Sequence, residues 1–530
     1  MNTRFAKSLT KVTSRRRLVG GAVAAALTGS RVALGSEAES ELSGNEGLPR
    51  AASGTEAGLA TQPNVVLIVL DDLAARMVAQ MPALQGMVGE QGVTFSNFFV
   101  TSPICGPSRA SLLRGQYAHN HGMLSNTGME GGFQTFHRLG REESTVATWL
   151  QAAGYHTALV GKYLNGFPKG VDPRYIPPGW DGWFAFSGRH PSYYGFELNE
   201  NGTLRDYGTG ASDYSTDVLS ARASDVVNRA ADAGSPFFLT VAPLAPHEPA
   251  PPAPRHAEAF AGEPAPRPPS HNEADVDDKP SWVRAAPLLT PGQISKIDEI
   301  HRQRLRSLLA VDEMVVSLVD TLRRKQALEN TYFFFTSDNG SFAGEHRLGI
   351  GKQAAYEEAI RVPLLVWGPG IPGGQTVPEL CLNTDLAPTI AELAGVTVPT
   401  FVDGRSLAPL ISGKQPSTSR SAFLVEHFAP VRRSAPRPNE DPSNDEEVVA
   451  ETVPQHRALR TSEATYVEYD SGERELYNVR VDPYQLDNVV AEADPAAVES
   501  FSARLAQLAR CSGPGCRETE DASLEGTGSP

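Results

Sequence analysis

Val65-Val66-Leu67-Ile68-Val69-Leu70 runs directly into Asp71-Asp72, and this stretch sets the architecture that we expect for the chain. Six consecutive apolar residues favour a strand buried on both faces of a largely parallel sheet. Similar apolar runs follow at residues 156–160, 237–241, 332–335 and 362–367, with helical spacing at 144–153 and 294–328. The sequence therefore predicts an α/β fold, with a mostly parallel central sheet flanked by helices.

A second acidic segment follows another of these runs. Residues 332–335 lead through Thr336-Ser337 into Asp338-Asn339-Gly340. Ligands of open parallel sheets bind just beyond the carboxyl ends of the strands, so two neighbouring strands would bring these side chains together. The oxygen donors are Asp71, Asp72, Asp338 and Asn339. Such hard donors favour Ca²⁺ or Mg²⁺ over Zn²⁺, although an Asp pair after a strand is also typical of a helix cap or a turn.

A cysteine stands at the expected start of a helix. The segment reads Pro103-Ile104-Cys105-Gly106-Pro107-Ser108-Arg109, continued by Ala110-Ser111-Leu112-Leu113-Arg114-Gly115. Pro107 suits the first helical turn, because its missing N–H would have no partner there. The free N–H groups of that helix end would stabilise a thiolate or a bound anion, and Arg109 lies about one turn away. A buried or redox cysteine before an ordinary helix is the plainer alternative.

This segment resembles the signature of the sulfatase family, Cys-x-Pro-Ser-Arg followed by an apolar pair and a glycine. The matching residues are Cys105, Pro107, Ser108, Arg109, Leu112, Leu113 and Gly115. The resemblance implies that a formylglycine-generating enzyme converts Cys105 to Cα-formylglycine, which works as an aldehyde hydrate. It also implies an alkaline-phosphatase-like core and a bound Ca²⁺, with Mg²⁺ as the alternative. The implied metal ligands are Asp71, Asp72, Asp338, Asn339 and residue 105.

A lysine after another predicted strand extends the resemblance. Gly161-Lys162-Tyr163-Leu164-Asn165-Gly166 matches the family's Gly-Lys segment, which implies that Lys162 binds sulfate. Leu164 stands where the family often has a histidine, so the base that regenerates the aldehyde stays open. Asn165 is a candidate to occupy part of that space.

Two further segments resemble catalytic motifs of the family. Pro246-His247-Glu248-Pro249 is similar to its Pro-His-x-Pro, which makes His247 the expected acid for the leaving alcohol. The glycines of residues 344–352 would let that loop fold back and bring His346 and Lys352 towards the sulfate. His119 and His121 are further candidates to line the pocket, without the soft ligands that zinc would need.

In the implied mechanism, one hydroxyl of the residue 105 hydrate attacks sulfur, and Asp338 accepts its proton. Charge on the sulfuryl oxygens would be balanced by Arg109, Lys162 and Lys352. His247 protonates the departing alcohol, and the second hydroxyl then expels sulfate and restores the aldehyde. The same site would also suit a phosphonate or phosphate ester hydrolase, whereas an unmodified thiol would leave a non-catalytic binder of sulfated glycans.

The substrate class follows from a finer resemblance. Gly161-Lys162-Tyr163-Leu164-Asn165, with the later Ile176-Pro177-Pro178-Gly179-Trp180, resembles the glucosamine-6-sulfatase and extracellular heparan-sulfatase branch. We therefore expect a carbohydrate or aryl sulfate, either small or an oligosaccharide, as substrate.

Composition and cysteine usage limit the partners. The chain has 530 residues and a net charge of -15, which argues against nucleic acid, although a local cluster of cations can still bind an anion. Cys511 and Cys516 flank a Ser-Gly-Pro-Gly spacer and are expected to form a small disulfide, consistent with export. Cys381 is expected in the core.

The N-terminus resembles a twin-arginine export signal, although a chance basic N-terminus would look similar. It carries Ser14-Arg15-Arg16-Arg17-Leu18-Val19, then an apolar stretch that is too short and glycine-rich for a stable membrane span. We expect a secreted or cell-envelope protein. The expected divisions are a signal peptide at 1–35, a disordered lead-in at 36–62, the catalytic domain at 63–428, a proline-rich acidic insertion at 429–454, a C-terminal subdomain at 455–510 and a tail with the disulfide at 511–530.

The C-terminal subdomain has its own pattern. Residues 456–461, 465–469 and 473–477 predict short antiparallel strands, and residues 497–509 predict a helix. A second proline-rich excursion, at 246–291, begins at the candidate histidine and is expected to pass near the active site.

Overall fold

The computed structural model describes residues 62–188, 191–416, 418–430 and 453–523. The predicted export signal at 1–35, the lead-in up to residue 61 and residues 431–452 of the predicted insertion lie outside these ranges. Among the described residues, no helix combines the length and the apolar character that a membrane crossing requires.

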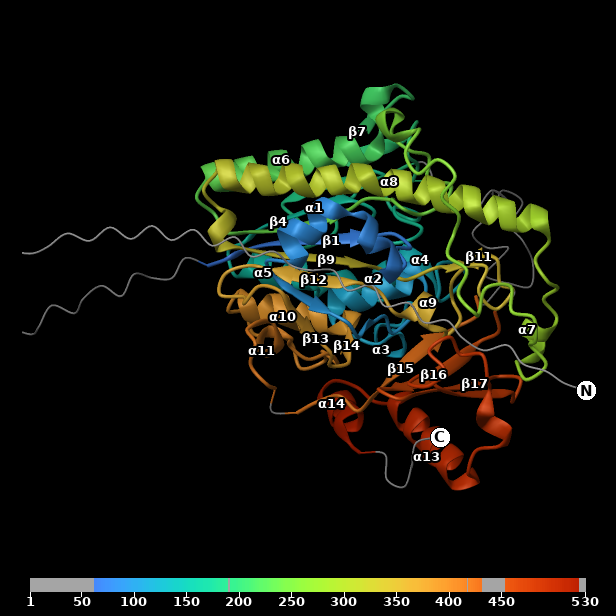
Figure 1. The fold of residues 1–530 in the computed structure, drawn as a ribbon. Helices are drawn as coiled ribbons and strands as arrows, with labels where there is room; N and C mark the ends of the chain where they lie inside the picture. The colour runs from blue at the N-terminus through green and yellow to red at the C-terminus, as the bar shows by residue number, and fades with distance from the viewer. Residues whose placement is uncertain (1–61, 189–190, 417, 431–452, 524–530) are drawn as a thin grey trace, which may run out of the picture. The chain divides into compact units, whose positions relative to one another are not determined.

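A ten-stranded sheet runs through residues 64–377 (Figure 1). Its strands are β1 (Asn64–Leu70), β2 (Val93–Phe95), β4 (His156–Gly161), β5 (Gly182–Phe186), β6 (Glu197–Glu200), β7 (Thr203–Asp206), β8 (Phe237–Ala242), β9 (Thr331–Ser337), β12 (Leu364–Trp367) and β13 (Gln375–Val377). They lie in the order β13-β2-β12-β9-β1-β8-β4-β5-β6-β7. The strands from β9 to β5 run parallel, whereas β12, β6 and β7 pair antiparallel. The predicted α/β fold with a mostly parallel sheet is confirmed.

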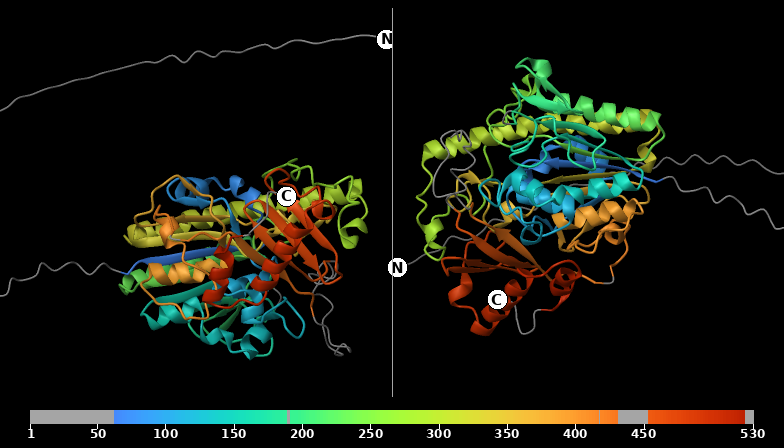
Figure 2. Two further views of the ribbon diagram at one scale, coloured as in Figure 1. Left: turned by 90° about the horizontal axis from the view of Figure 1, so that it is seen from below. Right: turned by 180° about the vertical axis from the view of Figure 1, so that it is seen from behind.

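Helices cover both faces of this sheet, as Figures 1 and 2 show. One face packs against α6 (Ser215–Asp232) and α8 (Pro291–Arg324). The other packs against α2 (Cys105–Arg114), α5 (Val146–Ala152) and α10 (Leu386–Leu393). Alternate residues of β1 enter the two cores, Val66 on one side and Val65 on the other, which explains why its sequence is apolar throughout.

The shorter helices connect these elements. They are α1 (Pro82–Leu84), α3 (Ala118–His121), α4 (Gly132–Arg138), α7 (Ser281–Arg284), α9 (Glu357–Ile360) and α11 (Ala408–Ile411). Two pairs of two-residue strands complete this part of the chain, β3 (Phe98–Phe99) with β14 (Cys381–Leu382) and β10 (Phe342–Ala343) with β11 (Ile350–Gly351). Cys381 is buried in the core, as predicted.

A separate four-stranded antiparallel sheet lies in the C-terminal part. It consists of β15 (Ala422–His427), β16 (His456–Thr461), β17 (Ala464–Tyr469) and β18 (Arg474–Asn478), with α13 (Pro495–Leu508) and α14 (Pro514–Asp521) beside it. The predicted antiparallel sheet and helix are confirmed, and so is the disulfide between Cys511 and Cys516. The strand β15 was not expected in this sheet, and the domain boundaries at 428 and 455 stay predictions.

The candidate site lies where several strands of the large sheet end, beside the long loop segment at residues 246–291. β1 and β9 pair in register from Asn64 with Thr331 to Leu70 with Ser337, so the acidic residues that follow both strands come to the same level. Residue 247 follows β8, which pairs with β1, and residue 162 directly follows β4. Within residues 246–291, the amide of Asn272 donates to the carbonyl oxygen of Gly344, so this excursion does pass beside the glycine-containing loop.

Candidate active site

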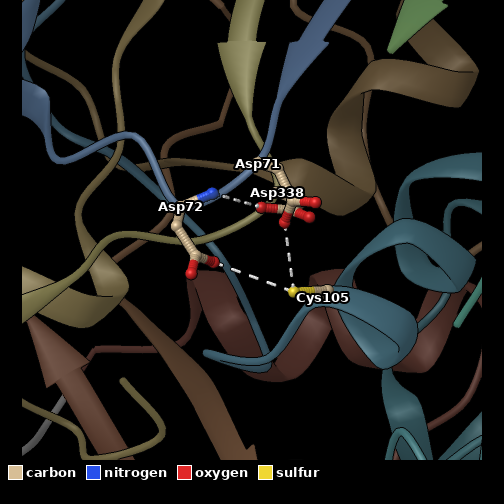
Figure 3. A group of neighbouring side chains, drawn as sticks. All are labelled: Asp71, Asp72, Cys105 and Asp338. Atoms are coloured by element: carbon tan, nitrogen blue, oxygen red, sulfur yellow. Dashed lines mark hydrogen bonds between the residues drawn. The ribbon is translucent and has the colours of Figure 1, made fainter. Parts of the chain in front are cut away.

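Three carboxylates and a cysteine meet at the carboxyl end of the central strands. One donor atom each from Asp71, Asp72, Cys105 and Asp338 lies within 4.8 Å of the others. Figure 3 shows the aspartates at the ends of β1 and β9, facing Cys105 at the start of α2. The Cys105 Sγ lies 3.3 Å from Asp71 Oδ1 and 3.7 Å from Asp72 Oδ1. The structure thus brings the predicted acidic residues and the predicted nucleophile together.

The backbone of Asp72 has an unusual conformation. Its φ of 65° lies in the left-handed region, which residues other than glycine adopt rarely. The Asp72 amide donates to Asp338 Oδ1 at 3.1 Å, and the Leu73 amide donates to Ser337 Oγ at 2.9 Å. Side chains at the end of β9 therefore fix the turn that follows β1.

Asn339 supplies a test of whether a cation fits here. Its Nδ2 donates to Asp72 Oδ1 at 2.6 Å and to the Gly340 carbonyl oxygen at 2.9 Å. Its Oδ1 is buried and makes no hydrogen bond in the described part of the chain. The Asn339 amide group thus contacts the Asp72 carboxylate through Nδ2, and its unsatisfied oxygen would become a ligand for a hard divalent cation if the two ends of the amide exchanged places. The donor set therefore fits Ca²⁺ or Mg²⁺.

Three cationic side chains enclose the carboxylates. Lys162 Nζ lies 2.6 Å from Asp71 Oδ2, and Arg109 Nε donates to Asp338 Oδ2 at 2.7 Å. Lys352 Nζ donates to Asp72 Oδ1 at 2.6 Å and lies 2.8 Å from Cys105 Sγ. These contacts place all three predicted sulfate-binding cations at the cluster.

The cations also set the ionisation of Asp71. Burial alone would raise the pKa of this carboxyl group, but Lys162, His247 and Arg109 together hold that pKa well below its usual value. Asp71 is therefore a carboxylate at neutral pH, as a metal ligand must be.

The nucleophile position lies at a helix start, as predicted. Ile104 has extended backbone angles, and α2 begins at Cys105 itself. The Cys105 side chain is fully buried, and burial raises the pKa of its thiol well above the usual value, against the opposing effect of Lys162 and Lys352. The unmodified residue is thus a neutral thiol. The adjacent Gly106 amide donates to Asn126 Oδ1 at 2.8 Å.

His247 lies at the rim of the cluster. Its Nε2 is 3.7 Å from Asp72 Oδ2, and its Nδ1 lies 2.7 Å from the Glu248 carbonyl oxygen. Because a carbonyl oxygen can only accept, Nδ1 carries a proton, and Nε2 is the atom that would exchange one with a ligand.

His346 makes its contacts outside the cluster. Its Nδ1 lies 2.8 Å from Glu273 Oε2, and its ring stacks on Tyr356 with centroids 4.1 Å apart. The same loop brings Lys352 to the cluster, where its Nζ contacts Asp72 and Cys105. A sulfate-binding role for His346 stays a prediction.

The expectation that His119 and His121 line the pocket needs correction. His119 lies 2.8 Å from Glu426 Oε2 and 3.0 Å from the Cys511 carbonyl oxygen. His121 Nε2 lies 3.1 Å from Ser111 Oγ, and its Nδ1 accepts from the Met123 amide. Both rings therefore hold α3 against its neighbours.

The structure shows where Leu164, the departure from the family pattern, lies. It also shows two residues near the site that the sequence did not single out, Asn126 and Asn383. Leu164 is buried in the apolar core, so no side chain from that position reaches the site as a base. The Asn165 Oδ1 is buried and makes no hydrogen bond among the described residues. Ser108 Oγ donates to the Asp338 carbonyl oxygen and accepts from Asn383 Nδ2 at 2.9 Å. Neither Asn126 nor Asn383 stood out in the sequence, because a lone asparagine carries no motif.

The fold and this cluster define an α/β protein with a candidate cation site at the carboxyl end of its sheet, enclosed by cationic side chains that suit an anionic ligand. The family model described as Sulfatase matches residues 63–396. The chain is also 36% identical over 482 residues to the N-acetylglucosamine-6-sulfatase of Capra hircus, covering 86% of this chain and 85% of that relative. The chain belongs to the sulfatase family and is a hydrolase of sulfate esters.

Solved structures agree with this assignment. A protein in complex with its substrate D-glucosamine-2-N,6-O-disulfate matches with a TM-score of 0.69 and 25% identity, covering 88% of this chain and 100% of that chain. The phosphonate monoester hydrolase of Silicibacter pomeroyi matches with a TM-score of 0.65 and 23% identity, covering 88% and 97%. The second likeness shows a shared fold.

Proposed function

We propose that this sulfatase hydrolyses the 6-O-sulfate ester of a glucosamine-type sugar. The observation that carries the substrate class is the 36% identity to an N-acetylglucosamine-6-sulfatase over most of both chains. The solved complex with a glucosamine disulfate supports the same class.

We infer that a divalent cation, Ca²⁺ in the first place and Mg²⁺ as the alternative, binds at the acidic cluster. Asp71, Asp72, Asp338 and Asn339 would hold it, with residue 105 completing the set. When bound, such a cation polarises the oxygens of the ester and lowers the pKa of an adjacent hydroxyl group. The strongest support is the convergence of three carboxylates on Cys105 within 4.8 Å, with the buried amide of Asn339 in contact with Asp72.

Residue 105 is proposed to act as Cα-formylglycine, made from Cys105 by a formylglycine-generating enzyme. The hydrated aldehyde supplies one hydroxyl group as nucleophile and a second one whose ionisation releases sulfate. In this structure the Sγ of Cys105 marks the position of a hydroxyl oxygen of that hydrate. Its contacts with Asp71, Asp72 and Lys352 suit a hydroxyl group that must lose its proton.

The other side chains divide the remaining work. Arg109, Lys162 and Lys352 counter the charge of the sulfuryl oxygens, a contribution that usually dominates such transfers. His247 donates a proton from Nε2 to the leaving sugar oxygen, since its Nδ1 is bound to a carbonyl oxygen. The Nε2 atom lies 3.7 Å from Asp72 Oδ2, so the ring faces the acidic cluster with the atom that would donate.

Assays on matched esters test the substrate class. We expect N-acetylglucosamine-6-sulfate and glucosamine-2-N,6-O-disulfate to be cleaved faster than a galactosamine-4-sulfate or a phenyl sulfate, with C105A as the inactive control. Faster cleavage of a 4-sulfate would contradict the proposed sugar class. A preference for phosphonate or phosphate monoesters would favour the other chemistry known for this fold.

We also propose export by the twin-arginine route. Support comes from Arg15 and Arg16 in the N-terminal sequence and from the disulfide near the C-terminus. Replacing Arg15 and Arg16 with lysine should leave the protein in the cytoplasm of its host. Unchanged export of that variant would rule out the route.

A further inference from the structure

A buried arginine on the long helix α8 reaches the two loops that carry the acidic cluster. Arg304 is only 5% exposed. One terminal nitrogen, Nη2, donates to the carbonyl oxygen of Asp72, and the other, Nη1, donates to Ser341 Oγ at 2.8 Å. Asp72 follows β1, whereas Ser341 follows β9, so a single guanidinium group bridges both loops.

The contact with Asp72 falls on the residue with the left-handed backbone. Its amide is held by Asp338 Oδ1 and its carbonyl oxygen by Arg304, so both backbone polar groups of Asp72 have partners. Its side chain then points at Asn339 and Lys352, with Oδ1 2.6 Å from a nitrogen of each. The direction of the Asp72 carboxylate therefore depends on a backbone conformation that two neighbours must hold.

The contact with Ser341 fixes the second loop. Ser341 is 2% exposed, and its Oγ also donates to the Phe342 carbonyl oxygen at 3.2 Å. It lies two residues after Asn339, so its position constrains the turn that presents the amide oxygen of Asn339. Both acceptors of the Arg304 guanidinium group are neutral oxygens, and the planar fork of arginine suits two acceptors at a fixed separation.

We propose that Arg304 is a positioning residue that sets the divalent-cation affinity of the cluster by bridging the loops after β1 and β9. It acts through geometry, and the charge of the carboxylates is balanced by Arg109, Lys162 and Lys352. Partners that orient metal ligands are commonly worth 10–100-fold in metal affinity. This inference rests on the proposed cation site.

Calcium binding to the full chain tests it without reference to catalysis. Calorimetric titration of EGTA-treated protein with CaCl₂ would compare wild type, R304M and R304K. Arg306 offers a matched control, because it lies on the same helix and donates from Nε to a backbone carbonyl oxygen, that of Ala259, away from the cluster. We expect a Kd about tenfold higher or more for R304M, a clearly raised Kd for R304K, and an unchanged Kd for R306M.

Comparing R304K with R304M separates the effect of the guanidinium geometry on calcium affinity from the effect of its charge. A wild-type Kd in R304K would overturn the inference, because lysine keeps the charge and loses the fork. A wild-type Kd in a folded R304M would overturn it as well. If circular dichroism shows that R304M does not fold, R304K decides alone. Absence of calcium and magnesium binding in the wild type would instead overturn the cation site, and the inference with it.

Discussion

Two clusters of buried charge differ in how completely one buried arginine in each of them is hydrogen-bonded. In the first, between the catalytic part and the C-terminal sheet, Arg420 donates from Nη1 and Nη2 to both carboxylate oxygens of Asp385 at 2.8 Å and from Nε to Glu520 at 2.9 Å. Every nitrogen of that guanidinium group therefore has an acceptor. In the second, at the acidic site, the Nη2 of Arg109 has no hydrogen bond among the described residues, and neither has the Oδ1 of Asn339.

The difference separates a structural cluster from a reactive one. A buried ion pair holds its position when each group is satisfied, and it becomes costly when one is not. The unsatisfied atoms of the second cluster lie at the carboxyl end of the sheet, where the proposed cation and an anionic substrate would complete them. Changing one cluster at a time and measuring both activity and stability tests this contrast.

The largest effect should follow from removing the nucleophile position. Cys105→Ala should lower kcat/KM by on the order of 10⁴-fold or more, because the attacking group is lost while the folded core is kept. Steady-state assays and thermal melting measure the two quantities. Cys381→Ala removes the other free buried cysteine and should retain activity. If the C105A variant were nearly as active as wild type, the cluster around residue 105 would not be the reactive one.

Breaking the satisfied cluster should act on stability instead. Arg420→Met leaves the buried carboxylate of Asp385 without its ion-pair partner and should lower the free energy of unfolding by about 3–5 kcal/mol. Glu520 keeps its ion pair with Arg405 in this variant. Urea denaturation gives that value, and the kcat of the folded fraction should stay within about twofold. Arg480→Met, at an exposed position, should change the stability by less than about 0.5 kcal/mol. A variant at Arg420 that loses kcat and keeps its stability would reverse the assignment.

A change at Lys162 tests whether a single cation of the acidic site contributes to catalysis. Lys162→Ala removes the cation beside Asp71 and should lower kcat/KM by about 10²–10³-fold. Lys169→Ala, in the exposed loop that follows, serves as the control. Equal kinetics for the two variants would mean that Lys162 does not face the reacting ester.

A buried histidine pair should give the smallest effect, on stability against pH. Burial lowers the pKa of His427 to about 3 and that of His456 to about 4. Below the unfolded value of about 6.5, the unfolded chain binds protons that the folded chain does not, so stability falls as the pH falls. The loss from pH 7 to pH 5 should be roughly 2 kcal/mol per histidine. Denaturation of His456→Asn should show a shallower dependence than wild type, and an equal slope would contradict the assignment.

Some features of the fold and of the candidate site can be predicted from the sequence, because they depend on residues that are neighbours in the chain. The apolar residues of β1 and the motif around Cys105 carry local patterns, and strand ends in a parallel sheet meet by topology. The clustering of Asp71, Asp72, Cys105 and Asp338 could therefore be predicted before the structure.

Other features depend on contacts that no local pattern carries. Arg304 resembles Arg302 and Arg306 in the same helix, and only the packing of α8 over the sheet distinguishes it. The strand β15 pairs with β16 across a long intervening segment, so its membership of the C-terminal sheet could not be read from spacing. The partner of His346 is likewise a residue from a distant excursion, Glu273.

The chemical state of residue 105 gives the most direct test of the proposed formylglycine mechanism. Mass spectrometry of the peptide that contains this residue, from active protein made in its own host, would identify the side chain. We predict an aldehyde or its hydrate in place of the thiol. An intact cysteine in fully active protein would contradict it.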